Sequence, residues 1–342
     1  MTLSPYERAK QSILEELEKF RSKIEPTVRE VSAISASQSK MREILKNSTE
    51  ISVVESFLTG SYARQTMIRP LKDVDFLVQM NYGAHKNDNS LQLLNRVRRV
   101  LSKAYPSTPI TITLPCIKVQ FNYCHFEIVP AFAIKGNEDL FEIPANVGIG
   151  WQQTYPKIPD KWMTQENKKS EGLFIPTIKM LKRWRDTHCR QLRSFHLEML
   201  TRMAFDYYKV DNYAVGIWAF FARASYLFDL YKNTPFVPEP GRNNVYVDQY
   251  LYANPFLLAT VKQKIKIHFT YAQKAFDYMQ KGQIGFAKQL WGKILGSSFY
   301  TPSTLPSPFS SLLMSPAPIP PQTTFPSLLS ELLKRRIDSR DV

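Results

Sequence analysis

Apolar residues recur at helical spacing near the start of the chain, where Ile13, Leu17 and Phe20 would share one helix face and charged residues fill the other positions. Pro26 interrupts this pattern and suits the first turn of a new helix. We therefore expect two helices at the N-terminus, the second over about residues 28–45.

After residue 50 the pattern changes to short apolar runs of strand length, separated by polar turns. One longer amphipathic stretch, residues 91–104, follows a good N-cap at Asn89 and Ser90 and predicts a helix. From about residue 160 the pattern is mainly helical, with many aromatic residues on the apolar faces. The predicted strands are residues 53–58, 74–78, 110–113, 117–121 and 126–129.

These elements predict an α+β fold, in which a lobe with a mixed sheet and helices is followed by an all-α helical lobe. The length of 342 residues suits two packed units or one large bilobal one. We expect N-terminal helices that pack across the lobes (1–50), a sheet lobe (51–158), a helical lobe (159–300) and a tail (301–342).

The tail is distinguished by its composition. Residues 301–322 are rich in Pro and Ser, which predicts a mobile segment that adds little to the core. Leucines then recur at helical spacing over 327–336, after a cap at Ser327, and predict a short helix. This helix either folds back on the helical lobe or presents its leucines to a partner.

Charge narrows the classes of partner. The chain has 45 Lys and Arg against 30 Asp and Glu, a formal net charge of +15. Hydrophobic residues make up 44% of the chain, which excludes wholesale disorder. The positive charge suits polyanions, but it does not separate a protein that binds nucleic acid from an enzyme that acts on triphosphates.

Other features argue against secretion and membrane insertion. The longest apolar stretch, residues 212–222, stops at Arg223, far short of the ~20 residues that span a bilayer. The N-terminus lacks the pattern of a secretory signal. The 3 cysteines cannot form a disulfide framework, and their spacing matches no zinc motif. We expect a soluble, cytoplasmic protein.

Candidate chemistry starts at the end of the first predicted strand, where Gly60 and Ser61 begin a turn. Glycine permits close backbone approach, and serine adds a hydroxyl and an N–H, so this junction could hold a phosphate. A Gly-Ser turn alone is weak evidence, and its value depends on its neighbours.

The neighbours are carboxylates. Strand alternation places Asp73 and Asp75 on one face of the second strand and apolar residues on the other. Glu127 occupies the same kind of position in the last predicted strand. Gathered carboxylates repel each other unless a cation lies between them, and hard oxygen ligands suit Mg²⁺ or Mn²⁺. The pattern predicts a two-metal site for phosphoryl transfer.

The segments GSYARQTMIRP, DVDFLV and FEIVPAF resemble the bacterial cGAS/DncV-like nucleotidyltransferases of CBASS antiphage systems, the SMODS type within the polymerase-beta superfamily. The similarity continues through LKRW at 181–184, SFHLE at 194–198 and LWGKILG at 290–296, and covers about residues 52–299. One departure is Glu127, which stands where the family more often has Asp.

The resemblance implies that the sheet lobe is the catalytic lobe of a nucleotidyltransferase, with the active site in the cleft between the lobes. It assigns Asp73, Asp75 and Glu127 as catalytic residues that hold two Mg²⁺ ions, with Mn²⁺ as an alternative. It also implies that the turn at Gly60 and Ser61 holds the donor triphosphate.

Further contacts are implied in the helical lobe. The resemblance gives phosphate contacts to a helix lysine and a later serine, which correspond to Lys182 and Ser194, with Lys179 one turn earlier as the rival lysine. The aromatic residue after that serine, Phe195, would stack on a nucleobase.

The implied function is the joining of nucleoside triphosphates, with release of pyrophosphate, into a cyclic di- or trinucleotide second messenger of antiphage defence. ATP and GTP are the expected substrates, pyrimidine triphosphates remain open, no nucleic-acid template is required, and an ancillary CBASS protein could bind the C-terminal tail. The alternatives are a linear oligonucleotide synthase of the oligoadenylate-synthase type, an enzyme that extends RNA ends, and a non-catalytic nucleic-acid-binding module. The three acids argue against the last, because clustered carboxylates are costly without a cation.

Overall fold

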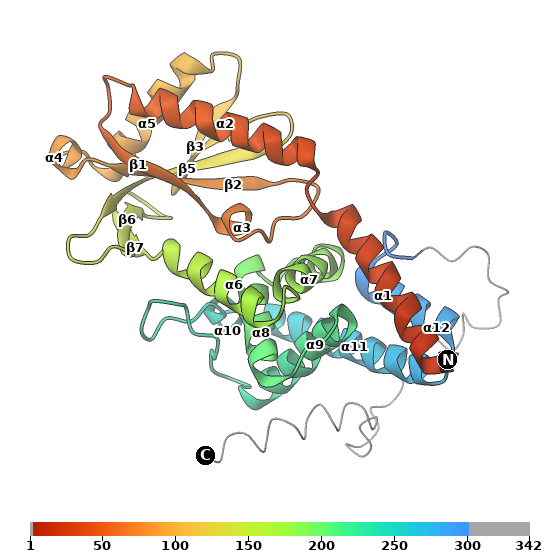
Figure 1. Cartoon of the computed structure of the whole chain (residues 1–342). Coiled ribbons are helices and arrows are strands. Elements are labelled where there is room, and N and C mark those ends of the chain that lie inside the picture. Colours follow the sequence, from red (N-terminus) through yellow and green to blue (C-terminus); the bar gives the residue numbers. More distant parts are fainter. Residues whose placement is uncertain (1–2, 301–342) are drawn as a thin grey trace. The chain divides into compact units, whose positions relative to one another are not determined.

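The computed structural model describes residues 3–300, which form two compact units (Figure 1). The sheet unit comprises Lys23–Lys169 and Pro238–Val245. Of the described residues, the helical unit comprises those up to Ser22, Ser170–Val237, and those from Tyr246 onward. The predicted tail, 301–342, and its predicted helix lie outside the described residues.

The sheet unit is built on a mixed sheet of seven strands. The main path has the order β1-β2-β5-β4-β3, and β6 and β7 extend it from β5. β2 and β5 run parallel, whereas the other pairs along the sheet are antiparallel. The strands are β1 (Val53–Thr59), β2 (Asp73–Met80), β3 (Ile110–Thr113), β4 (Cys116–Gln120), β5 (His125–Ala133), β6 (Phe141–Pro144) and β7 (Trp151–Thr154).

Two helices, α2 (Val28–Lys46) and α5 (Ser90–Ala104), cover one face of this sheet (Figure 1). Each begins with a capping box, set by Thr27 for α2 and by Asn89 for α5. Their apolar faces and one side of the strands form one core. The other side of β2 and β5 carries a smaller apolar cluster, which includes Leu77 and Ala131, as well as polar residues. Shorter helices of this unit are α3 (Gly60–Ala63), α4 (Tyr82–His85) and α6 (Lys157–Lys169).

The helical unit packs its helices around a core rich in aromatic residues, in which Trp184, Trp218 and Trp291 are fully buried. α9 is apolar on nearly all sides and lies at the centre of this core, as expected for a helix without a polar face. The helices are α1 (Pro5–Ile24, whose last two residues belong to the sheet unit), α7 (Phe174–His188), α8 (Ser194–Tyr207), α9 (Tyr213–Leu230), α10 (Gln249–Tyr252), α11 (Pro255–Gln280) and α12 (Ile284–Leu295).

The predicted fold class, a mixed sheet with helices plus a separate helical part, is confirmed. All five predicted strands and the helices beside them are present to within a few residues at each end. The two short strands β6 and β7 were not predicted. No helix of residues 3–300 combines the length and apolar character needed to cross a membrane. The predicted domain boundaries and the placement of the site in a cleft stay predictions.

Candidate active site

The predicted acids lie on one face of the sheet, on two strands that pair directly. In β2, Val74 and Phe76 are fully buried in the core, so Asp73 and Asp75 point to the opposite face. In β5, Phe126 and Ile128 are buried in the same way and Glu127 is left on the acid face. The parallel register sets Asp75 beside Glu127, so the two strands bring their carboxylates together.

Gly60 lies against this cluster at the point where β1 ends. Thr59 pairs with Asp75 across β1 and β2, and α3 begins at the next residue. Gly60 has a φ of +68°, and a Cβ added there would lie 1.7 Å from Asp75 Oδ2. Only glycine therefore fits, and the backbone of the predicted phosphate turn touches the carboxyl of Asp75. Ser61 follows as the second residue of α3.

A lysine that the sequence analysis did not single out lies among the acids. Lys118 Nζ on β4 donates to Asp73 Oδ1 at 3.0 Å and to Glu127 Oε1 at 3.4 Å. Lys118 and Glu127 are direct partners in the antiparallel register of β4 and β5. The position of Lys118 between two buried residues could have predicted that its side chain leaves the core face of the strand. Its place opposite Glu127 could be known only from the pairing of β4 with β5.

The acid cluster carries more negative charge than its cations balance. The pKa of Asp75 is raised to about 6, first by burial and then by the negative charges of Glu127 and Asp73, against the opposing effect of Arg64. Arg64 also lies 3.7 Å from Asp160 of α6, so its charge is shared between two carboxylates. Arg64 was not predicted as a site residue either. Its place in GSYARQT was the available signal.

The remaining predicted residues lie in the helical unit. Lys182 on α7 is paired with Glu198 on α8, with Lys182 Nζ 2.6 Å from Glu198 Oε1, and the two side chains are 5% and 0% exposed. Lys179, one turn earlier, is half-buried. Ser194 and Phe195 begin α8 and are also half-buried, so both reach the surface of their unit. Their roles and that of either lysine stay predictions.

Comparison with known proteins agrees with this arrangement. Residues 12–167 match the family model described as the Second Messenger Oligonucleotide or Dinucleotide Synthetase domain, SMODS. The chain contains a SMODS-type synthetase domain. The predicted family and enzyme class are thereby confirmed.

Individual relatives extend this similarity beyond the matched domain. A cyclic AMP-AMP-AMP synthase from Acinetobacter sp. is 27% identical over 296 residues, which cover 81% of this chain and 82% of the relative. CdnC from E. coli MS115-1, solved as a complex with HORMA-deltaN, has a TM-score of 0.61 at 18% identity, covering 84% of this chain and 98% of that one. CdnG from Bradyrhizobium diazoefficiens, solved with GTP, has a TM-score of 0.65 at 13% identity, covering 84% and 98%. The two structures share the fold of this nucleotidyltransferase.

The donor set suits a hard divalent ion, since the SMODS-type site offers three carboxylates on adjoining strands and a protonated amine already lies between two of them. Within residues 3–300, however, no three His, Cys, Asp or Glu side chains are arranged to hold a metal ion as they stand. Mutual repulsion of carboxylates and their pairing with Lys118 account for this open arrangement. The three carboxylates therefore fit the ion by their chemistry.

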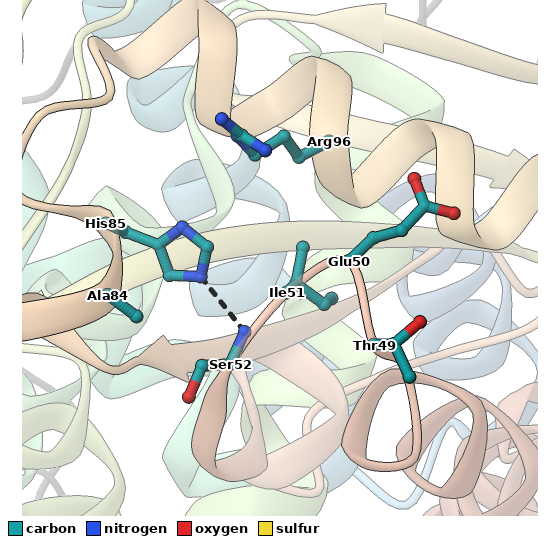
Figure 2. A pocket seen from close by; sticks show the side chains of 7 residues that line it. All are labelled: Thr49, Glu50, Ile51, Ser52, Ala84, His85 and Arg96. Carbon is teal, nitrogen blue, oxygen red and sulfur yellow. Dashed lines mark hydrogen bonds between the residues drawn. The ribbon is translucent and has the colours of Figure 1, made fainter.

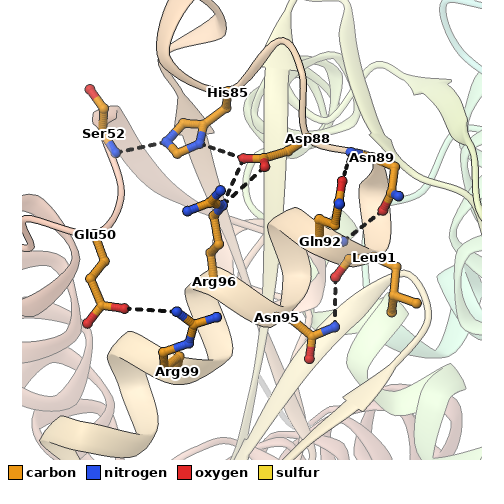
Figure 3. A network of polar contacts seen from close by, with 10 residues as sticks. All are labelled: Glu50, Ser52, His85, Asp88, Asn89, Leu91, Gln92, Asn95, Arg96 and Arg99. Carbon is orange, nitrogen blue, oxygen red and sulfur yellow. Dashed lines mark hydrogen bonds and ion pairs between the residues drawn. The ribbon is translucent and has the colours of Figure 1, made fainter.

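A second polar region lies in the sheet unit, at the other end of β1. Figure 2 shows a small pocket there, beside the hydrogen bond from the Ser52 N–H to His85 Nε2. Figure 3 shows the wider network, in which His85 Nδ1 lies 3.0 Å from Asp88 Oδ2 and Arg96 Nε 3.0 Å from the same oxygen. The pocket has a volume of about 230 Å³ and is lined by Thr49, Glu50, Ile51, Ser52, Ala84, His85 and Arg96.

Proposed function

We propose that this nucleotidyltransferase joins nucleoside triphosphates into a cyclic di- or trinucleotide second messenger and releases pyrophosphate, as part of antiphage defence. The synthetase domain and the cyclic AMP-AMP-AMP synthase among its relatives support this product class. Other relatives bear the name CBASS oligonucleotide cyclase, which supports the defence role. The same proposal includes a cytoplasmic location for the enzyme. It also includes synthesis without a nucleic-acid template.

The observation that carries the proposal is the acid face of the sheet unit. Asp73, Asp75 and Glu127 lie on adjoining parallel strands, and the backbone of Gly60 touches the side chain of Asp75. These three residues would hold Mg²⁺ or Mn²⁺, which when bound would stabilise negative charge on the reacting phosphate groups. Ser61 would contact the donor triphosphate beside them.

We infer that ATP is a substrate, since the Acinetobacter relative is named for a product made of AMP units. GTP is the second candidate, because CdnG has been solved in complex with it. Pyrimidine triphosphates are further candidate substrates. All four labelled nucleoside triphosphates should therefore be supplied to the protein, singly and mixed.

The test is to incubate the full-length protein with labelled triphosphates and Mg²⁺, and then to treat the products with phosphatase. A cyclic product keeps its label, because it has no terminal phosphate, whereas a linear product loses terminal phosphate. Asp75→Asn should abolish product, and Asp139→Asn is the matched control, because it removes a carboxylate from an ion pair with Lys161 elsewhere in the same unit. Linear product from the wild type would favour the oligoadenylate-synthase alternative, and no product under any condition would contradict the proposal.

A test of the phosphate contacts proposed for the helical unit must use variants that leave no unpaired buried charge at Lys182 and Glu198. Lys182→Ala would leave Glu198 charged and buried without this partner, which costs roughly 3–5 kcal/mol of stability. The double variant Lys182→Met with Glu198→Gln removes both charges, and a higher apparent Michaelis constant for triphosphate in this folded variant would support a phosphate role for Lys182. Lys179→Ala is the parallel measurement, and a larger effect there would assign the role to Lys179.

We also propose an ancillary protein partner that binds the C-terminal tail. Supporting this, the structure of CdnC was solved as a complex with HORMA-deltaN. Truncation after Tyr300 tests the site: lost partner binding with unchanged basal synthesis would support it. Loss of thermal stability or of basal synthesis would instead indicate that the tail serves the enzyme itself.

A further inference from the structure

Lys118 has a position that three strands determine together. It lies on β4 between Ile117 and Val119, which are both fully buried in the core, so its side chain must leave the sheet on the acid face. Its direct partner on β5 is Glu127, and β5 in turn pairs with β2, which carries Asp73. Sheet registers, and not a flexible loop, therefore bring this ammonium to the acids.

The contacts of Lys118 show what it does there. Its Nζ donates to Asp73 at 3.0 Å and to Glu127 at 3.4 Å, and its side chain is 25% exposed. Partial burial by itself lowers the pKa of Lys118, but the hydrogen bond and charge of Asp73, together with those of Glu127, outweigh it and raise the pKa. A cation thus bridges two of the three carboxylates, whereas Asp75 is left out of the bridge.

We propose that Lys118 is a positioning residue, an internal counter-ion that holds Asp73 and Glu127 in the metal-free protein and competes with a divalent cation for them. The inference rests on the proposed function, because it takes these acids as the metal ligands. Its physical basis is charge: an ammonium that donates to two ligand oxygens cannot remain there when the same oxygens surround another cation.

Two consequences separate this role from a merely structural one. Removing the positive charge should raise the affinity of the site for divalent cations, because the three carboxylates then lack their internal competitor. It should also lower the stability of the metal-free protein, because the carboxylates then repel each other without compensation, and added Mg²⁺ should restore that stability. A lysine that only supports the fold would lower stability without this dependence on the cation.

The experiment measures Mn²⁺ binding to the full-length, nucleotide-free protein by calorimetry, and thermal unfolding in EDTA and in Mg²⁺. Lys118→Met should lower the dissociation constant for Mn²⁺ about tenfold, as expected for loss of one charge next to a divalent ion in a solvated site. Its unfolding temperature should be lower than that of the wild type in EDTA and should rise more on addition of Mg²⁺. Lys118→Arg keeps the charge and should stay close to the wild type. Lys46→Met removes an exposed lysine of α2 as the control and should change neither quantity.

A second measurement needs no variant and holds even where Lys118→Met fails to fold. Acetylation of lysine amines in the wild type, read residue by residue by mass spectrometry, should be faster at Lys118 in Mg²⁺ than in EDTA. The rate at Lys46 should be the same in both.

The outcomes distinguish this inference from the proposed function. Equal or weaker Mn²⁺ binding by Lys118→Met, with binding lost in Asp75→Asn, would overturn the role of Lys118 and leave the metal site intact. Unchanged acetylation of Lys118 on addition of Mg²⁺ would also overturn it. If the wild type binds no Mn²⁺ and Asp75→Asn changes nothing, both the counter-ion role and the metal site are wrong.

Discussion

The two ends of β1 carry two polar clusters with opposite charge balance. At the Thr59 end, Asp75 pairs across the strands with Thr59 and lies beside Glu127. At the other end, the N–H of Ser52, just before β1, donates to His85, which belongs to the network of Figure 3. Both clusters contain carboxylates close to bases, and both belong to the sheet unit.

The difference lies in how completely the charges are matched. In the His85 network, Asp88 is bonded by both His85 and Arg96, and Glu50 is paired with Arg99 and Lys103. In the acid cluster, a single lysine serves two carboxylates, and the pKa of Asp75 is raised to about 6. Polar groups that satisfy one another stabilise a fold, whereas an excess of one charge is a binding site for the other.

The largest expected difference between the clusters is in turnover. Asp75→Asn removes a carboxylate that no other group replaces, so we expect nucleotide turnover to fall by about 10³-fold or more with the fold intact. Glu127→Gln should be similarly damaging, and Glu127→Asp should retain activity. Product formation from labelled ATP and circular dichroism of the same samples check this. Normal turnover in Asp75→Asn would remove the acid cluster from the active site.

Gly60→Ala tests the close contact between the turn and the acids. A methyl group at this position would overlap Asp75 Oδ2, and the positive φ would be strained. Displacement of the carboxylate by an ångström should lower turnover about 10²-fold. Gly136→Ala is the control, because its φ is also positive and a Cβ there meets nothing within 4 Å. Equal loss in both variants would mean that backbone strain, and not the contact with Asp75, causes the effect.

The raised pKa of Asp75 predicts how stability depends on pH. In the unfolded chain this carboxyl has a pKa near 3.8, against about 6 in the fold, so its ionisation opposes folding at neutral pH by ~3 kcal/mol. This destabilisation is fully present above pH 6 and disappears as the pH falls towards 4. Metal-free Asp75→Asn should therefore be more stable than the wild type at pH 8 and equally stable at pH 4, as measured by urea unfolding in EDTA. A pH-independent difference would show that the charge of Asp75 is not the cause.

Asp88→Ala should affect stability and leave chemistry unchanged. It removes the partner of the buried His85 and of Arg96, which costs about 1–3 kcal/mol in the free energy of unfolding. Turnover per folded molecule should equal that of the wild type, measured below the unfolding transition. A loss of turnover comparable to that of Asp75→Asn would mean that the two clusters do not differ in role.

The smallest effect is expected at the rim of the same network. Arg99 lies 3.6 Å from Glu50, and its side chain is 59% exposed. Arg99→Ala should therefore change the free energy of unfolding by less than about 1 kcal/mol, and this difference should shrink further in 1 M salt. A larger, salt-independent loss would show that Arg99 stabilises the fold through packing.

Local sequence patterns were sufficient to predict many of the helices and strands of this protein and the face on which the acids lie. Alternation placed Asp73, Asp75 and Glu127 opposite the core, Pro26 marked the start of α2, and the cap at Asn89 marked the start of α5, because these signals depend only on neighbours along the chain. The resemblance of the motifs then pointed to the nucleotidyltransferase class and to the SMODS domain, which the match over residues 12–167 confirmed.

Tertiary structure alone decided how these residues meet. The parallel pairing of β2 with β5 sets Asp75 beside Glu127, and the pairing of β4 with β5 brings in Lys118. The contact of Gly60 with Asp75 likewise depends on strand pairing, because it joins the residue after β1 to a residue inside β2. Alternation is a property of one strand, but register depends on hydrogen bonds between segments distant in sequence, so the acids could be foreseen from the sequence and their counter-ion could not.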